Sequence, residues 1–96
     1  MTAPLLLVGR VRKAHGLAGE FLVESMTDAP DVVFTSGRRL FAGTTAGDPA
    51  PDGAMLTITG VRRHGEAVRL KLAELTTREQ ADAWRGRYLL LPQDQL

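Results

Sequence analysis

The apolar residues of this chain occur in six short segments of strand length, each bounded by glycine, proline or polar turn residues. Apolar and polar side chains alternate within them, which is the period of a half-buried strand. The clearest example sets Val68, Leu70 and Leu72 against Arg69 and Lys71. The pattern predicts an all-β fold, and a six-stranded antiparallel barrel is favoured over a sandwich because closure removes the edges of so small a sheet. The six segments are residues 5–12, 20–26, 38–42, 55–63, 66–75 and 87–91.

The first two segments are predicted to form a hairpin. Strict alternation within residues 5–12 places Val8 on the same face as Arg10. Gly16 and Gly19 then follow, and glycine permits the positive φ that tight loops require. We therefore expect an ordered loop whose shape these two glycines set.

One segment has helical character. Either Thr76 or Thr77 has a capping-box glutamate or glutamine three residues later, so the start is open by one residue. Gly86 is suited to end the helix. We expect one short helix around residues 77–84, with Trp84 as its contact to the barrel.

Two longer connections differ in character. Residues 27–37 begin with turn residues and then carry Val32, Val33 and Phe34, which we expect to cover an apolar surface. Residues 43–54 have no large apolar side chain, which predicts a loop outside the core that tolerates change.

Composition sets the size of the core. Leu, Val, Ile and Phe account for 25 of the 96 residues, which is enough for one folded domain spanning residues 1–96 but too few for two. The absence of cysteine excludes disulfide scaffolds, zinc knuckles and thiol catalysis. No apolar run is long enough for a membrane span and no signal peptide is evident, so we expect a cytoplasmic protein. The predicted core comprises Phe21, Val23, Leu56, Ile58, Val68, Leu70, Leu72 and Leu90.

A first basic cluster lies at the end of the first predicted strand. The net charge is only +1 and does not indicate a binding partner, so only local clusters of charged residues can do so. Basic side chains beside glycines that expose backbone N–H groups suit an anion such as a phosphate. The alternative is a solvated strand end with a structural turn. The cluster comprises Arg10, Arg12, Lys13 and His15.

A second basic cluster lies between the fourth and fifth segments. Arg62 and Arg63 precede His64 and Gly65, which we expect to form the two-residue turn of a hairpin. The cluster is either a second anion-binding tip or an ordinary polar turn. Whether the two clusters share one surface stays open at this point.

The sequence shows no catalytic or metal-binding motif. His15 and His64 are isolated, whereas a metal site needs three or four ligands. Nucleophile elbows, phosphate-binding loops and metalloprotease helices are absent from the sequence. We therefore expect no metal, no organic cofactor and no enzymatic activity.

Several short motifs, taken in order along the chain, resemble the N-terminal domain of the ribosome maturation factor RimM family. No single motif is specific, but the histidine-glycine core together with the downstream helix is characteristic. The resemblance runs from about residue 7 to residue 96. The motifs are VGRV at 8–11, AHGL at 14–17, GE at 19–20, RHG at 63–65, TRE at 77–79 and WRG at 84–86.

The resemblance implies a six-stranded barrel like that of translation factors. It also implies an assembly factor without catalysis that acts on 16S rRNA at the head of the small ribosomal subunit. Contact with small-subunit ribosomal protein nineteen is attributed mainly to a second barrel of the photosynthetic-reaction-centre (PRC) type, which this chain does not include. Taken with the two basic clusters, this makes Arg10, Arg12, Lys13, Arg62 and Arg63 our candidate phosphate contacts, with His15 orienting the loop or touching RNA and Gly16, Gly19 and Gly65 shaping the turns.

Two other interpretations remain open. Similar small barrels occur in flavin reductases, and bound flavin after purification would reveal that class. A module that docks on protein alone would show no salt-dependent RNA binding. In every case we expect a monomer.

Overall fold

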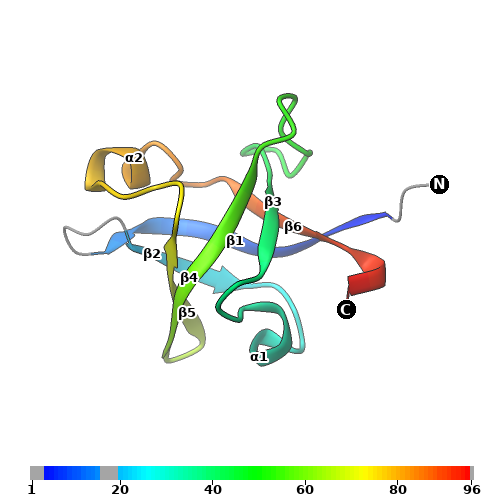
Figure 1. Ribbon diagram of the computed structural model, residues 1–96, viewed down its shortest axis with the longest axis horizontal. Coiled ribbons are helices and arrows are strands. Elements are labelled where there is room, and N and C mark those ends of the chain that lie inside the picture. The colour runs from blue at the N-terminus through cyan, green and yellow to red at the C-terminus, as the bar shows by residue number, and fades with distance from the viewer. Residues whose placement is uncertain (1–3, 16–19, 96) are drawn as a thin grey trace.

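The computed structural model describes residues 4–15 and 20–95 and contains a closed six-stranded antiparallel barrel (Figure 1). Around the barrel the strands are ordered β1-β2-β5-β4-β3-β6. This architecture confirms the predicted fold class. The strands are β1 (Leu5–His15), β2 (Glu20–Ser25), β3 (Arg39–Ala42), β4 (Met55–His64), β5 (Ala67–Leu72) and β6 (Tyr88–Pro92).

Strand β1 closes the barrel because it pairs with β2 on one side and with β6 on the other. Val8, Val11 and Ala14 are all buried, although strict alternation would put residues three apart on opposite faces. The pairing register shifts between Leu7 and Gly9 against β6, and again between Val11 and Lys13 against β2. Irregularities of this kind turn the next side chain to the other face. The prediction that Val8 shares a face with Arg10 is therefore wrong.

The interior is apolar, and all eight predicted core residues are buried. Leu90 is buried on a different side from its neighbours, since Leu89 and Leu91 belong to the main core cluster and Leu90 does not. Leu90 pairs across strands with Leu7 and Phe41. Strand β6 is thus covered on both faces, which explains its nearly continuous apolar sequence.

The connection between β3 and β4 packs on this outer face. Gly43 lies so close to Leu90 that an added Cβ would stand 2.8 Å from its Cδ1 atom, and Gly47 approaches Leu7. Ala50 is 7% exposed, so the prediction of a loop wholly outside the packed interior is wrong at this residue. The loop covers part of the barrel with backbone and small side chains.

A second helix, α1 (Pro30–Val33), was not predicted from the sequence. Proline occupies its first turn, and the amide of Phe34 donates to the carbonyl of Pro30 at 2.8 Å. This single turn buries Val33 and Phe34 against the core but leaves Val32 52% exposed. The expectation that all three would cover an apolar surface is correct for two and wrong for Val32, because a helical turn points successive side chains in different directions.

The predicted helix is α2 (Arg78–Asp82), and it is shorter than expected. Thr77 is its N-cap and forms a reciprocal capping box with Gln80, which settles the alternative left open by the sequence. Gly86 has φ +84° in the turn that follows. Trp84 is partly buried and packs against the core cluster, as predicted. A short 3₁₀ turn, η1 (Gln93–Gln95), follows β6.

The turn between β4 and β5 is displaced by one residue from its prediction. His64 is the last residue of β4 and pairs with Ala67, so the connection is Gly65 and Glu66. Gly65 has φ +63°, and glycine in the first position of a two-residue hairpin turn is typical of type II′.

Glu74 connects the turn after β5 to β4. Its carboxylate accepts hydrogen bonds from the Thr57 amide at 2.7 Å and from the Thr57 hydroxyl at 3.0 Å. Partial desolvation would raise the pKa of Glu74, but these hydrogen bonds and the nearby Arg39 together hold the pKa below its usual value of 4.5. The charged form of Glu74 therefore stabilises the turn that leads into α2.

Substituting Gly9→Ala should destabilise the protein by about 1–3 kcal/mol, as overpacking of a core does. A Cβ at residue 9 would stand 2.8 Å from Val23 Cγ1 and 3.2 Å from Phe34 Cζ, and both side chains are buried. The matched control is Gly60→Ala, whose Cβ would meet only Lys71 Cβ at 3.5 Å. Urea unfolding should show a loss for the first variant and little change for the second. Equal stability of the two variants would contradict the close packing at Gly9.

Substituting Glu74→Gln should reduce stability at neutral pH by less than about 1 kcal/mol, because the group is largely exposed. A lowered folded-state pKa contributes stability that is present above the unfolded value and lost as the pH falls through the folded value. The difference from wild type should thus be present at pH 7 and shrink below pH 4.5. Urea unfolding at both pH values measures it, with the exposed Glu66→Gln as control. A difference that is independent of pH would contradict the assignment.

Candidate nucleic-acid interface

Three arginines from distant parts of the chain line one hollow on the outer surface, which we call the arginine hollow. Arg10 and Arg12 belong to β1, and Arg85 belongs to the connection between α2 and β6. Backbone of Val11 and Gly86 completes the lining, and the volume is about 230 Å³. No acidic residue lines the hollow, so it is suited to an anion.

Backbone hydrogen bonds hold Arg85 beside β1. The amide of Gly86 donates to the carbonyl of Val11, and the amide of Val11 donates to the carbonyl of Arg87, both at 2.8 Å. These bonds fasten the connection to the strand just where Arg10 and Arg12 leave it. Arg85 was missed in the sequence analysis because its neighbours in the hollow are far away along the chain. The one available signal was its place directly before Gly86, the residue expected to end the helix.

Two of the three arginines also contact other side chains. The Arg10 guanidinium lies 5.5 Å from the centre of the Tyr88 ring. Arg12 forms an ion pair with Glu24 at 3.4 Å, with both side chains about half exposed. Such an exposed pair is worth little and exchanges readily for another anion. Lys13 is also exposed, opposite Leu22 of β2.

Arg87 has a structural position instead. Its guanidinium stacks 3.7 Å from the centre of the Trp84 ring, and its Nε donates to the carbonyl of Gly43 at 2.8 Å. The side chain therefore joins the end of α2, the start of β6 and the β3–β4 loop. This arrangement fixes the connection that carries Arg85.

The second predicted cluster separates in the structure. Arg62 pairs across strands with Arg69, whereas Arg63 pairs with the buried Val68. Paired residues lie on the same face of a sheet, so Arg62 projects outward and Arg63 leaves on the interior side. There Arg63 forms an ion pair with Asp31 of α1 at 3.0 Å. Adjacent in sequence, the two arginines serve different surfaces.

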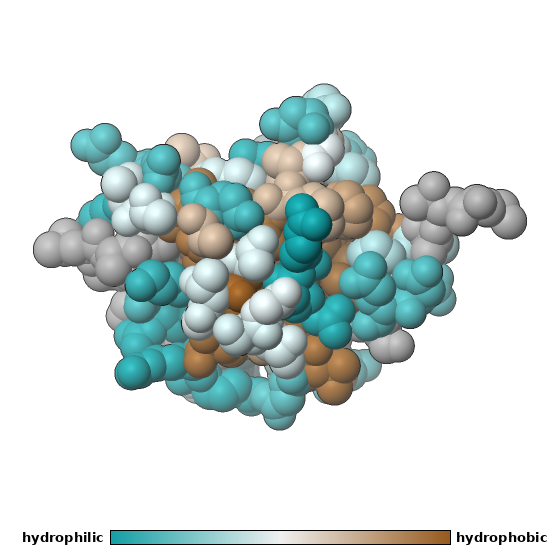
Figure 2. All heavy atoms as spheres, in the orientation of Figure 1, coloured by the Kyte–Doolittle hydropathy of each residue, from teal (hydrophilic) through white to brown (hydrophobic). Residues whose placement is uncertain are grey.

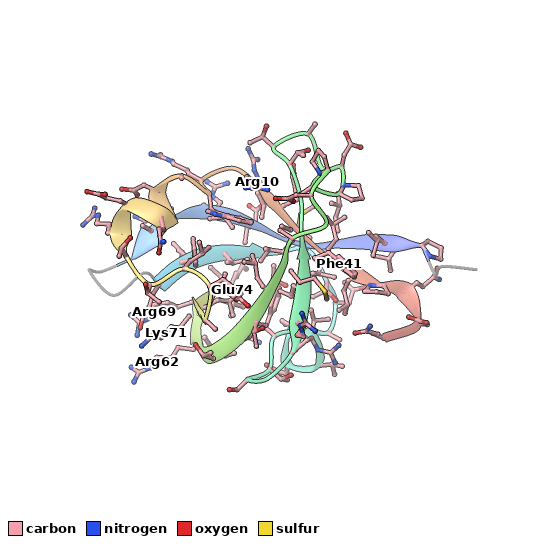
Figure 3. The ribbon with its side chains drawn as sticks, turned by 45° about the horizontal axis from the view of Figure 1, so that its top comes forward. Arg10, Phe41, Arg62, Arg69, Lys71 and Glu74 are labelled. Carbon is pink, nitrogen blue, oxygen red and sulfur yellow. The ribbon has the colours of Figure 1, made fainter. Side chains whose placement is uncertain are left out.

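Arg62 belongs to a second hollow on the outer face of β4 and β5, which we call the hairpin hollow. Its other basic side chains are Arg69 and Lys71, and Glu20 of β2 lies at its side. The volume is about 160 Å³. Figure 3 shows Arg62, Arg69 and Lys71 on the same side of the barrel, with Arg10 well apart from them.

The strand register places the residues of the first cluster along the whole length of β2. Glu20 pairs with His15 and with Lys71, whereas Glu24 at the other end of β2 pairs with Arg10 and with Ala67. His15 and the β4–β5 turn therefore lie at opposite ends of β2, while Arg10 lies at the same end as the turn. Arg10 and Arg62 nevertheless line separate hollows. Of the predicted site residues, Gly16, Gly19 and the side chain of His15 lie outside the described residues, as does the side chain of His64.

Within residues 4–15 and 20–95, no three histidine, aspartate or glutamate side chains gather where they could hold a metal ion. In the same part of the chain, no helix has the length and apolar character needed to cross a membrane.

Comparison with known proteins gives consistent matches. The family model of the RimM N-terminal domain matches residues 6–96. The crystal structure of a 16S ribosomal RNA processing protein, RimM, from Pseudomonas aeruginosa aligns with a TM-score of 0.80 and 26% identity, over 97% of this chain and 53% of that chain. The solution structure of the N-terminal domain of RimM from Thermus thermophilus aligns with a TM-score of 0.67 and 20% identity, over 96% of this chain and 93% of that chain.

The fold and the two basic hollows define a small antiparallel β-barrel domain with two clusters of basic side chains on its outer face. The chain belongs to the RimM family of ribosome maturation factors, whose N-terminal domain it matches over nearly its whole length. It spans about half the length of the Pseudomonas protein.

Substituting Arg87→Gln should destabilise the protein by about 1–2 kcal/mol, because a stacked cation and a hydrogen bond to a backbone carbonyl are lost together. Trp84 is the only tryptophan, so its emission reports the change directly and should shift to longer wavelength. The exposed Arg85→Gln is the control and should leave the emission unchanged. Unaltered emission and stability in the first variant would show that the stack does not fix the connection.

Proposed function

We propose that this domain acts in maturation of the small ribosomal subunit by binding 16S rRNA at the head of the subunit, without catalysing a reaction. Membership of the RimM family supports the ribosomal setting. The Pseudomonas protein, described as a 16S ribosomal RNA processing protein, supports rRNA as the ligand.

The observation that carries the proposal is the arginine hollow. Arg10, Arg12 and Arg85 come together around exposed space that no carboxylate lines. Guanidinium groups are the preferred partners of phosphates because their planar donors match the phosphate oxygens. Contacts to the RNA backbone position a protein without reading sequence, which suits an assembly factor that holds rRNA while it folds.

The residues of the arginine hollow are suited to binding a ligand and not to catalysis. The side chains that line it are those of three arginines, and a guanidinium group is neither a nucleophile nor a general base at neutral pH. The other partners are proposed for the larger protein. We assign contact with small-subunit ribosomal protein nineteen mainly to a second domain, since this chain spans about half of the Pseudomonas protein. The ribosomal role that we propose implies a cytoplasmic protein.

The double variant Arg12→Gln with Arg85→Gln should weaken binding to a transcript of the 16S rRNA head domain. The slope of log K against log salt is negative, and each lost phosphate contact makes it shallower by about 0.7–0.9, so the loss of two contacts makes it shallower by about 1.4–1.8. Fluorescence anisotropy across a salt series measures both affinity and slope. Wild-type affinity should be micromolar, as is usual for electrostatic binding by so small a domain.

The charge-matched control is Arg39→Gln with Arg78→Gln, two exposed arginines on β3 and α2 that line neither hollow. It should retain the wild-type slope. Wild-type protein that shows no salt-dependent binding would contradict the RNA function and favour docking on protein alone. Equal weakening by both double variants would show that net charge matters and the hollow does not.

A further inference from the structure

We propose that the hairpin hollow of Arg62, Arg69 and Lys71 is a second phosphate-binding site for RNA, separate from the arginine hollow. The inference rests on the proposed function, because it takes the same RNA as ligand. It adds a site on another face of the barrel and includes two residues, Arg69 and Lys71, that the sequence analysis had assigned only to the polar face of a strand.

The first argument is the register of β4 against β5. Arg62 stands directly opposite Arg69, and Gly60 directly opposite Lys71. Directly opposed side chains have Cβ atoms about 5 Å apart, and like charges in such a pair destabilise a sheet. Arg69 has an ion-pair partner in Glu20, so the arginine that folding does not account for is Arg62. A bound anion between them would turn the repulsion into attraction.

The second argument is the shape of the surface. Gly60 presents no side chain, and an added Cβ would meet Lys71 Cβ at 3.5 Å, so the glycine opens space beside the lysine. In the resulting hollow of about 160 Å³, Lys71 lies across from this gap on β5 and Arg62 lies two residues along β4. A phosphate group fits a space of this size with a cation on either side.

The third argument is the local balance of charge. Glu20 forms an ion pair with Arg69 at 3.2 Å and offsets one of the three cations. Among the described residues, Arg62 and Lys71 have no carboxylate within ion-pair distance. Both are exposed, and Figure 2 shows hydrophilic side chains gathered over the end of the β4–β5 hairpin at the lower left. The site thus keeps two positive charges for a ligand.

The two basic hollows are separated by an intervening strip. Between them lies a further hollow lined by Glu24, Glu66 and Arg12 together with Leu22 and Ala67. Its two carboxylates would repel an RNA backbone that tried to run straight from one basic hollow to the other. The domain therefore meets two phosphate segments on two faces, and it can hold two parts of a folded rRNA together.

The test uses the double variant Arg62→Gln with Lys71→Gln and the same head-domain transcript. The negative slope of log K against log salt should become shallower by about 1.4–1.8 relative to wild type. Combining these changes with Arg12→Gln and Arg85→Gln should give additive losses, since the sites are separate. The control Arg39→Gln with Arg78→Gln should keep the wild-type slope.

Thermal unfolding supplies a second measurement that separates binding from folding. Removing one of two opposed arginines relieves repulsion, so Arg62→Gln should raise the melting temperature by about 1–3 °C while it weakens RNA binding. If Arg62 instead stabilised the fold, Arg62→Gln would lower the melting temperature.

Two outcomes would overturn the second site. If the hairpin variant binds with the wild-type affinity and slope while the Arg12 and Arg85 variant is weakened, the hairpin hollow is not an RNA site and the proposed function stands. If wild-type protein shows no salt-dependent binding to the transcript, the proposed function and the second site fail together.

Discussion

The closing of the barrel by β1 is the constraint on which the rest of the structure depends. This strand must pair with β2 and β6 at once, and it meets them only because its register shifts once against each partner. The two shifts turn Val8, Val11 and Ala14 all inward, so one strand supplies side chains to the core along most of its length. A regular strand with the same sequence would have placed Val8 in solvent and left a gap in the core.

The same irregular strand creates the arginine hollow. Because every buried side chain among the described residues is apolar, each charged group of β1 has to leave on the outer face. Arg10 and Arg12 leave it where the backbone of Val11 is bonded to the connection that carries Arg85. The two hydrogen bonds between Val11 and this connection continue the pairing of β1 with β6, and they hold Arg85 beside Arg10 and Arg12. The arginine hollow and the seam between β1 and β6 therefore lie along the same stretch of β1.

The features that follow from local sequence pattern could be predicted, whereas the features that depend on the pairing of distant strands in the closed barrel could not. The strands, the core and the capping box at Thr77 follow from periodicity and residue type. Helix α1 is one turn long, too short for a helical period to register in the sequence. The facing of Val8 could not be foreseen, since alternation assumes a regular strand. Arg85 lies beside Arg10 only through the pairing of distant segments. The separation of Arg62 from Arg63, in contrast, follows from strand alternation, so the local pattern could have predicted it.

The arginines of this domain fall into two groups: those that connect parts of the fold, and those whose contacts do not stabilise it. The neighbours of each side chain distinguish the two groups. Arg87 is stacked and hydrogen-bonded to backbone, and Arg63 is paired with Asp31, so each joins parts of the fold. Arg62 faces Arg69, and among the described residues it forms no ion pair. Glu20 offsets the charge of Arg69 but leaves that of Arg62. Exposed ion pairs contribute little to stability, so a barrel held by an apolar core can carry unfavourable surface charges at small cost. The second phosphate site that we propose would give Arg62 the negative charge that its position in the sheet lacks.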